Sequence, residues 1–579
     1  MIARARFLGV LLAVTAGCPA PFQDGMVDSG MPDTQPPPPP DVPPPPPPPD
    51  VPLPPPPPPP PDVPMVPLPT IPEMPDMGPG IPRAPYDIGA VNVVDLWVAA
   101  SGGDDGTPNP GTNRMRPLAT LNGAWERTMD RSRNGWRINL LPGTHGGGGR
   151  SIRLEGRQMN AARERPIIIQ SADPMNRANF NIELFGLRVS YLYFININVT
   201  LAGGFDCIHF ELVDHGLLRG VRLQGRNGDG GTQETFKANQ CTYLYVEDSD
   251  IAGAWDNPLD YVGVQHGHFL NNRFHDSGDW CMYLKGGSAH FVVEGNEYYD
   301  CNVRGTSGGF TAGQGTGFEF MNPPYLHYEA YDIKFVNNIV RNTGGAGVGV
   351  NGGFNILIAH NTLYRVGAFL EGGASMLEVV HGRRGCDGTH DRCQEFNRMG
   401  GWGVDGEEEQ YIPSRNVYIY NNIFYNPRGV MTRFQTVNVD GVATPPAMSN
   451  VPGPSRADTN LRIRGNIFYD NPMREAAEFL GGSTGCLQTG ETATCSPAIV
   501  ARDNTWNRFE PDLMNPEMGD FRPRPGGMVA MARGMPVTPF LWDGVPARPP
   551  GVMQGMATNT LRRNRDGMPR MLPDRPGAY

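Results

Sequence analysis

Four polar residues lie ten to twelve positions before successive copies of a recurring turn motif: Lys237, Asp260, Lys285 and Asn351. Lysine can act as a base or as a positive charge, and aspartate can bind a cation or pair with a lysine. If the fold stacks these residues, they form either a structural ion ladder or a reactive edge. The choice depends on the elements that position them.

The recurring motif consists of alternating apolar residues, a turn residue, asparagine, any residue and a large apolar residue. Seven copies carry asparagine at the same slot: Asn272, Asn296, Asn338, Asn361, Asn422, Asn466 and Asn504. Three earlier segments fit with Ile197, Val221 and Ser249 in the slot, at steps of 24, 28, 23 and 24 residues up to Asn296. Period-2 apolar alternation within a repeat of about 20–25 residues predicts a solenoid of short strands. Stacking buries a continuous core, and we expect the slot asparagines to adopt a left-handed backbone and to hydrogen-bond between coils.

Three further segments strengthen this interpretation. Residues 96–125 read as a strand, a glycine-rich loop and a helix, residues 138–147 as the next strand and turn, and residues 519–534 as a closing segment. With the repeat, they make residues 90–579 resemble the right-handed parallel β-helix superfamily, the pectate-lyase-like proteins. The resemblance implies an all-β right-handed parallel β-helix of about ten coils, with an N-terminal capping helix and long loop insertions. It is specific for fold and weak for reaction, because this scaffold carries many activities.

The resemblance also implies a chemistry. A polysaccharide lyase removes the proton beside a uronate carboxylate, so it needs a base and a positive charge, often Lys or Arg and Ca²⁺ in this family. Lys285 would then be the base, and Asp260 with Asp256 would hold Ca²⁺ through oxygen ligands. The expected partner is a uronic-acid polysaccharide or another cell-surface glycan. A glycoside hydrolase would need two carboxylates at a defined separation, and no pair in the sequence is singled out.

Further residues are candidates for substrate binding. Lys237, Asn351 and Glu319 would extend the reactive edge, with Glu319 in the coil between Lys285 and Asn351. His381, Arg383 and Arg384 lie in a long insertion and could bind carboxylates, arginine in a bidentate manner. Tyr325, His327, Tyr328 and Trp402 could stack on sugars, although ordinary loop packing explains the insertions equally well. The alternative from another functional class is a non-catalytic surface adhesin or glycan-binding lipoprotein, in which Lys237, Asp260 and Lys285 form a structural ion ladder.

The N-terminus predicts export. Residues 1–18 contain a short basic and a short apolar region that end at Cys18, as in a lipoprotein signal, so we expect lipid attachment to Cys18. An ordinary secretory signal is the alternative. Residues 19–85 are proline-rich and cannot form a core, and they read as an extended stalk or a flexible spacer. Residues 86–579 form the β-helix domain. We expect a protein anchored in the cell envelope, at the outer membrane or cell surface, through its lipid.

Charge and cysteines add two expectations. The formal net charge of −11 argues against nucleic acid as a partner, and we expect a monomer. An even number of cysteines after Cys18 suggests disulfides in an exported chain. By proximity we expect Cys386–Cys393 and Cys486–Cys495 as local loop bridges, with Cys281–Cys301 as a weaker pairing.

Overall fold

The structure is a computed structural model of the 579-residue chain. It describes residues 84–146, 149–303, 308–313, 315–317, 328–368, 375–385, 409–432, 435–446, 451–470, 485–486, 494–540, 561, 563–570 and 575–579. Contacts divide the chain into residues 1–71 and 72–579, and every described residue belongs to the second unit. Within these ranges we find no helix with the length and hydrophobicity needed to cross a membrane.

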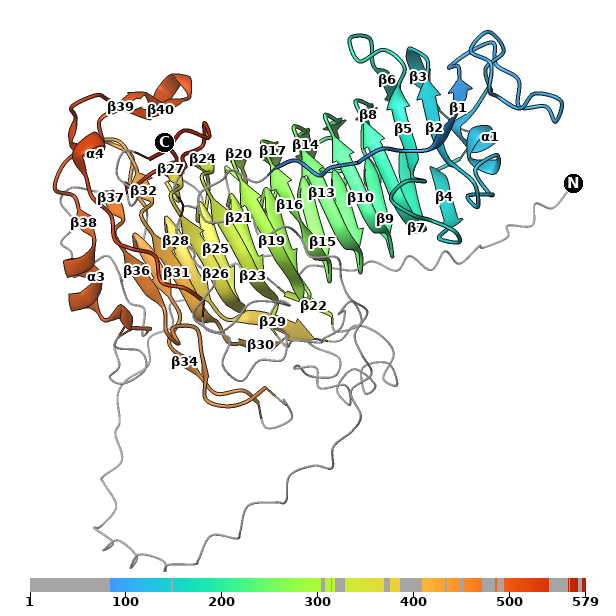
Figure 1. Ribbon diagram of the computed structural model, residues 1–579. Helices are drawn as coiled ribbons and strands as arrows, with labels where there is room; N and C mark the ends of the chain where they lie inside the picture. The colour runs from blue at the N-terminus through green and yellow to red at the C-terminus, as the bar shows by residue number, and fades with distance from the viewer. Residues whose placement is uncertain are drawn as a thin grey trace, which may run out of the picture. The chain divides into compact units, whose positions relative to one another are not determined.

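Three parallel sheets run along a stack of coils, and a typical coil contributes one strand to each in turn (Figure 1). The first sheet contains β4 (Ser151–Arg157), β7 (Glu183–Ile195), β9 (Ile208–Glu211), β12 (Phe236–Asn239), β15 (Leu259–Val262), β18 (Met282–Lys285), β21 (Phe310–Gly313), β25 (Val348–Asn351), β28 (Leu377–Val380) and β33 (Val437–Val439). The second contains β1 (Val93–Val98), β2 (Gly135–Leu140), β5 (Ile167–Ser171), the end of β7, β10 (Asp214–Arg219), β13 (Thr242–Glu247), β16 (Gln265–Leu270), β19 (Ser288–Glu294), β23 (Ala330–Val336), β26 (Gly353–Ala359), β31 (Arg415–Tyr420) and β36 (Arg462–Arg464). The third contains β3 (Gly143–His145), β6 (Ala178–Phe180), β8 (Asn198–Thr200), β11 (Arg222–Gln224), β14 (Asp250–Ala254), β17 (Arg273–Ser277), β20 (Glu297–Cys301), β24 (Ile339–Thr343), β27 (Thr362–Val366), β32 (Ile423–Tyr425), β37 (Ile467–Tyr469) and β38 (Thr505–Trp506).

The remaining elements are short. Strands β22 (Gly315–Gly317), β29 (Gly382–Gly385) and β30 (Glu409–Ile412) form a small sheet, and β34 (Val442–Ala443) with β35 (Ser455–Arg456) and β39 (Leu513–Asn515) with β40 (Asp520–Pro523) form two pairs. The helices are α1 (Leu121–Glu126), α3 (Pro497–Asp503), α4 (Met528–Met531) and the 3-10 turn η4 (Pro516–Met518). The expected N-terminal helix is α1, which begins where the Thr120 hydroxyl accepts a hydrogen bond from the Gly123 amide. Its residues Leu121, Ala124 and Trp125 are buried against the end of the core.

The period-2 alternation of apolar residues determines which side chains of each strand face the core. In the first sheet, Ile208, Phe236, Leu259, Met282 and Phe310 pair in register from coil to coil, and each is fully buried. The neighbouring residues on each strand point to the outer face. The parallel all-β fold is therefore confirmed, and the twelve described strands of the third sheet exceed the expected ten coils.

The slot asparagines form the expected ladder. Asn272 is buried, and its backbone N–H and its side-chain amide both donate to Asn296 Oδ1, at 2.8 and 3.0 Å. The same pattern continues through Asn338, Asn361, Asn422, Asn466 and Asn504. The left-handed residue is, however, the one before the slot, for example Asn271 (φ 55°) and Gly295 (φ 72°). The preceding residue makes the turn, and the slot residue points inward to make the hydrogen bonds.

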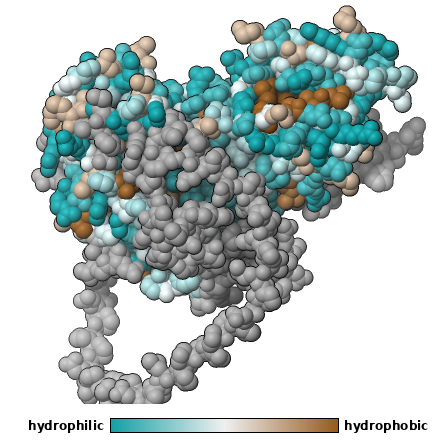
Figure 2. All heavy atoms as spheres, viewed as in Figure 1, coloured by the Kyte–Doolittle hydropathy of each residue, from teal (hydrophilic) through white to brown (hydrophobic). Residues whose placement is uncertain are grey.

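A second column lies on the outer face of the second sheet. It contains five rings from successive coils, Tyr191, His215, Tyr243, His266 and His290, with centroids 4.4, 4.5, 4.9 and 4.6 Å apart. All five residues have left-handed backbone, with φ between 56° and 64°. We call this column the Tyr–His stack. Residues 84–92 cross the same face, and Figure 2 shows a hydrophobic area over these N-terminal coils, where Tyr86, Ile88 and Val91 pack on outward residues of the sheet.

Candidate functional site

The outer face of the first sheet carries a row of polar side chains, which we call the ledge. Lys237 pairs in register with Asp260, and Asp260 pairs with Tyr283. Lys285 lies two residues further along β18, opposite Val262, so it is displaced from its expected register. In the strand register, Gln265 follows Val262 by three positions, whereas its partner Ala289 follows Lys285 by four. The chain between β18 and β19 therefore contains one extra residue, which shifts the count from the asparagine slot by one. Since alternate residues share a face, Lys285 still points to the same side as Asp260.

The three predicted residues are brought together. Lys237 Nζ lies 3.0 Å from Asp260 Oδ2, and Lys285 Nζ lies 3.4 Å from the same oxygen. Lys237 also contacts Glu234 Oε1 at 2.8 Å, and Lys285 lies over the Tyr283 ring at 4.2 Å. The Asp260 side chain is 2% exposed, whereas those of Lys237 and Lys285 are 20% and 15% exposed. A ligand approaching the ledge therefore meets the ammonium groups before the carboxylate.

Burial and charge set the protonation of this cluster. Burial acts to raise the pKa of Asp260, but the two ammonium groups outweigh it and hold that pKa below its usual value. For Lys237, burial is outweighed by Asp260 and Glu234, which raise its pKa well above the usual value. Burial raises the pKa of Glu234 well above its usual value despite Lys237. Two ammonium groups thus converge on one carboxylate, that of Asp260.

A second acidic group lies beside this cluster. Asp256 and Asp279 occupy equivalent places one coil apart, joined by the Asp279 N–H donating to the Asp256 carbonyl at 2.9 Å. The Asn257 amide donates to Asp256 Oδ1 at 2.7 Å and to the Tyr283 hydroxyl at 2.6 Å, and that hydroxyl reaches Asp279 Oδ2 at 3.5 Å. Burial, with the nearby charge of Asp279, raises the pKa of Asp256 to about 6.

Tyr283 and Glu234 were missed as site residues from the sequence, and Asp279 was considered only as one of several possible hydrolase acids and was not placed beside Asp256. Asp279 follows Asp256 by 23 residues, the same step that separates Lys237 from Asp260, so the repeat contained the signal. An exposed aromatic residue was also missed: Trp255 directly precedes Asp256 and is 46% exposed. By contrast, Tyr328 stacks on Phe354 at 5.0 Å and is not available as a sugar platform.

Other predicted residues lie further along the ledge. Asn351 Oδ1 accepts a hydrogen bond from the Thr311 hydroxyl at 2.9 Å, and Glu378 is on the outer face one coil later. Burial raises the pKa of Glu378 to about 7 despite its hydrogen bond with Asn351. His381 follows β28 and lies 3.2 Å from Asp440 Oδ2. His381 lies three coils, or about 14 Å, from Lys285, so these two side chains cannot act on the same substrate atom.

The remaining predicted binding residues belong to the insertions. The backbones of Arg383 and Arg384 lie in β29, where they pair with Gly315 and Thr316 of β22. Glu319 lies outside the described residues, as do Tyr325, His327 and Trp402.

The residues expected to hold Ca²⁺ do not fit that ion as a pair. Asp260 Oδ2 already accepts from two ammonium groups, and Lys237 Nζ occupies the space between Glu234 and Asp260. A divalent cation bound to Asp260 would therefore stand beside two positive charges, at a high electrostatic cost. Asp256 retains an ionisable carboxylate, but we derive no catalytic step from calcium, which stays a prediction.

Another group could hold a metal at the N-terminal end of the ledge. One ligand atom from each of Glu183, Asp206 and His209 lies within 4.8 Å of the others, and His209 pairs in register with Lys237. His209 Nδ1 contacts Asp206 Oδ2 at 2.9 Å, and its Nε2 lies 3.3 Å from the Asn239 amide. Both ring nitrogens of His209 are therefore occupied by protein partners.

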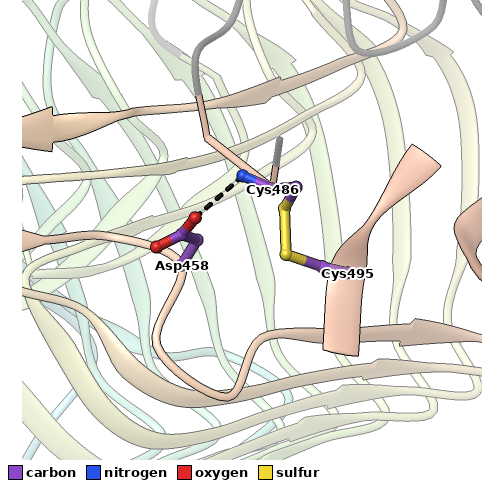
Figure 3. A group of neighbouring side chains, drawn as sticks. All are labelled: Asp458, Cys486 and Cys495. Atoms are coloured by element: carbon purple, nitrogen blue, oxygen red, sulfur yellow. Dashed lines mark hydrogen bonds between the residues drawn. A yellow bond between two sulfur atoms is a disulfide. The ribbon is translucent and has the colours of Figure 1, made fainter. Parts of the chain in front are cut away.

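The cysteines are structural. Cys281–Cys301 and Cys486–Cys495 are disulfides, so the second expected bridge and the weaker pairing both form. Asp458 lies beside the second disulfide and accepts a hydrogen bond from the Cys486 amide at 2.8 Å (Figure 3). Cys207 and Cys241, for which no pairing was predicted, are buried free thiols. Cys386 and Cys393 lie outside the described residues, as does Cys18.

Part of the chain matches a known protein family. Residues 194–383 match the family described as "Right handed beta helix region". No curated protein sequence matches the chain. Among solved structures, pectate lyase Pel9A is 15% identical, with 78% of this chain and 93% of that chain covered and a TM-score of 0.40. A rhamnogalacturonan lyase is 12% identical, covering 46% and 82%, with a TM-score of 0.31. The A-module of the Azotobacter vinelandii mannuronan C-5 epimerase AlgE6 is 12% identical, covering 56% and 89%, with a TM-score of 0.33.

These distant structures differ in the reactions that their names state, and none is similar enough to assign a reaction here. Residues 194–383 match the right-handed β-helix family, and the coils on both sides of that segment continue the same three parallel sheets. The chain therefore has the parallel β-helix fold.

Proposed function

We propose that the ledge binds an acidic polysaccharide and cleaves it by β-elimination. The observation that carries the proposal is the convergence of Lys237 and Lys285 on Asp260 Oδ2, with both ammonium groups more exposed than the acid below them. Removing the proton beside a uronate carboxylate requires a positive charge to neutralise that carboxylate and a base to take the proton. The ledge offers groups of both kinds within one coil.

The choice of lysine supports a chemical role over an ion ladder. The chain contains only three lysines among its 48 basic residues, and two of them meet at Asp260. Arginine would serve a structural ion pair at least as well, but it cannot release its proton in proteins. In a chain that otherwise uses arginine, lysine at both positions fits a need for a proton-exchanging amine.

The roles follow from position. Lys237 is held by Glu234 and Asp260 and would neutralise the uronate carboxylate. Lys285, held by Asp260 alone among the described carboxylates, would in its neutral form take the proton from C5. The electron pair of the broken C5–H bond forms the C4–C5 double bond and expels O4 of the neighbouring sugar, and that oxygen takes a proton back from Lys285 or from water. Trp255, exposed beside Asp256, offers an apolar face for a sugar ring. Asp256 is the competing base, because its pKa of about 6 leaves it ionised at neutral pH.

The test uses purified protein and a panel of uronic-acid polymers, with the ultraviolet absorbance of the new double bond as the readout. Lys285→Arg keeps the charge and removes the transferable proton, so turnover should fall by at least a hundredfold while polymer binding persists. Lys334→Arg, which alters the third lysine on the second sheet, is the matched control and should keep full activity. Asp256→Asn should leave turnover measurable. If this variant lost all turnover, Asp256 and not Lys285 would be the base.

Two outcomes would oppose the lyase. If wild-type protein binds a polymer but forms no double bond, the non-catalytic glycan-binding function is correct, and the ion pairs around Asp260 favour it as the second candidate. If new reducing ends form without ultraviolet absorbance, the reaction is hydrolysis, with Asp256 and Asp279 as the acids to examine.

We also propose that the chain is exported and anchored in the cell envelope by lipid on Cys18, as its N-terminal sequence suggests. Mass spectrometry of the protein from expressing cells should find a lipid-modified Cys18 as the first residue. Cys18→Ser should release the protein from the membrane fraction, and an unmodified N-terminus would support the ordinary secretory signal.

A further inference from the structure

The corner between the third and first sheets carries two exposed aromatic residues. Phe205 lies between β8 and β9 and is 40% exposed, and Trp255 lies between β14 and β15 and is 46% exposed. Among the residues that the structure describes, no other phenylalanine, tryptophan or tyrosine belongs to the exposed class. Single exposed apolar residues are common on protein surfaces, but two exposed aromatic rings at one corner are a stronger signal of a binding surface.

The two aromatic residues lie two coils apart along the axis of the stack. Gly204, the residue before Phe205, pairs with Thr232 of the next coil. The Thr232 carbonyl in turn accepts a hydrogen bond from the Trp255 N–H at 2.9 Å. Because neighbouring coils are about 4.8 Å apart, the backbones of Phe205 and Trp255 are separated by roughly 10 Å along the axis. That spacing is close to the length of a disaccharide unit in an extended glycan chain.

The coil between the two rings presents an amide. Gln233 follows Thr232, and its backbone N–H donates to the Gly204 carbonyl at 3.2 Å. Its side chain is half-buried, and within the described residues the side-chain amide has no hydrogen-bond partner, although both of its polar atoms reach solvent. Such an amide can donate to one sugar hydroxyl and accept from another. Phe205, Gln233 and Trp255 form a row that we call the aromatic strip.

Charges of both signs flank the aromatic strip, so its rings define it. The Arg150 guanidinium lies over the Phe205 ring at 3.2 Å, yet 40% of Phe205 stays exposed. Burial raises the pKa of Glu183 to about 7, and the charge of Arg150 opposes that rise, so Arg150 has an acid in its surroundings. At the other end, Asp256 directly follows Trp255. The feature that both ends share is an accessible ring, which can pack against the apolar face of a sugar.

We propose that the aromatic strip holds a glycan chain along the axis of the coils, with sugar residues stacked on Trp255 and Phe205 and the sugar between them hydrogen-bonded to Gln233. The strip borders the ledge, because β12 and β15 begin just after it and carry Lys237 and Asp260. A chain on the strip therefore extends from the ledge toward the N-terminal coils. The uronic-acid identity of the chain rests on the proposed function, whereas the strip itself requires only a sugar chain that reaches both rings.

Affinity electrophoresis of the full chain, in gels that contain polygalacturonate or alginate, tests the strip. At least one polymer should retard the wild-type protein. Trp255→Leu and Phe205→Leu keep an apolar side chain and remove the ring, so each should weaken binding about fivefold, whereas Phe205→Tyr should keep wild-type affinity. Met518→Leu, at an exposed apolar residue in η4, is the matched control and should bind as wild type does. The melting temperatures should be unchanged, because all of these side chains are exposed.

Chain length gives a second readout. A hexasaccharide of the retarding polymer should compete about tenfold better than its disaccharide, which reaches only one ring, and Phe205→Leu should reduce that ratio. Equal competition by the two sugars, wild-type affinity in both leucine variants, or no retardation of wild-type protein by either polymer would overturn the proposal.

These outcomes are distinguishable from those of the lyase test. A polymer that is cleaved with a new double bond, while both leucine variants bind normally, would leave the lyase without the aromatic strip. Binding that depends on Phe205 and Trp255 without any double bond would support the strip and oppose the lyase.

Discussion

The ledge and the Tyr–His stack are two columns built by the same stacking of coils, and they differ in what they stack. The Tyr–His stack places like on like, with rings 4.4–4.9 Å apart, and the carboxylates of Asp214 and Asp332 contact two of its rings from the side. The ledge places unlike groups together, with Asp260 buried beneath Lys237 and Lys285. The first arrangement gains stability from each added coil, whereas the second gives up solvation of its charges and gains reactive groups.

The comparison indicates how a repetitive fold separates stability from function. In the Tyr–His stack the contacts are replaceable, because each ring has a similar neighbour on both sides. In the ledge each contact is specific, because removal of one charge leaves another buried without compensation. The two columns should therefore respond very differently to single substitutions and to pH.

The largest effect is expected from Asp260→Asn. This change leaves Lys237 and Lys285 converging on a neutral amide, and loss of one partner of a buried ion pair costs about 3 kcal/mol. Urea unfolding should show this loss in the free energy of unfolding. The matched control is Asp214→Asn, because Asp214 contacts His215 of the Tyr–His stack at 3.0 Å with its side chain 39% exposed. An equal loss in both variants would erase the distinction between the columns.

The next largest effect is the response of the ledge to pH. Burial raises the pKa of Glu378 to about 7, above its value in the unfolded chain. The folded state therefore holds this proton more tightly, and its contribution is complete below the unfolded pKa near 4.3 and is lost as pH rises through 7. Between pH 5 and pH 8 this group should lower the free energy of unfolding by about 2 kcal/mol.

Glu378→Gln should remove that part of the pH dependence, measured by urea unfolding at each pH. The charge of Asp440 also acts on Glu378 and helps to raise its pKa, so the comparison is between wild type and variant over the same pH range. A variant whose stability falls with pH as steeply as wild type would show that Glu378 is not the group responsible.

A smaller and more informative effect is expected in the Tyr–His stack. Tyr243→Ala removes two stacking contacts, with His215 and His266, and should cost roughly 1–2 kcal/mol. Tyr243→Gly removes the same contacts but relieves the left-handed backbone at φ 57°, which costs a non-glycine residue about 1 kcal/mol. Thermal unfolding should rank glycine above alanine here, the reverse of their usual order in strands. The usual order would mean that the backbone at Tyr243 is not strained.

The repeat made the fold and much of the ledge predictable. The slot asparagine marks the coils from Asn272 to Asn504, where its side chain hydrogen-bonds to the next coil, so its spacing there reports the register directly. That register brought Lys237, Asp260 and Lys285 together in the prediction. Counting from the slot nevertheless misplaced Lys285 by two positions. One arises because Lys285 lies 11 residues before its slot and Asp260 lies 12 before its own, and the other because the turn before β19 has an extra residue, which leaves no mark in an apolar pattern.

Other features depend on contacts that no repeat encodes. Glu234 lies three residues before Lys237, ahead of β12, and contacts its ammonium group. Its pKa is raised by burial, which exists only when the coil is packed. Cys207 and Cys241 are consecutive free cysteines that counting alone would pair.

The smallest expected effect concerns calcium, and it separates the two interpretations of the ledge acids. Because Lys237 already lies between Glu234 and Asp260, Ca²⁺ should raise the melting temperature by less than about 1 °C, and a chelator should not lower it. Lys237→Met is the informative variant, since it removes the resident positive charge and leaves Glu234 and Asp260 facing each other. Calcium should then bind and restore part of the lost stability. A clear calcium response already in wild-type protein would instead place the ion at Asp256 or at Glu183, Asp206 and His209, and Asp256→Asn would decide between those two places.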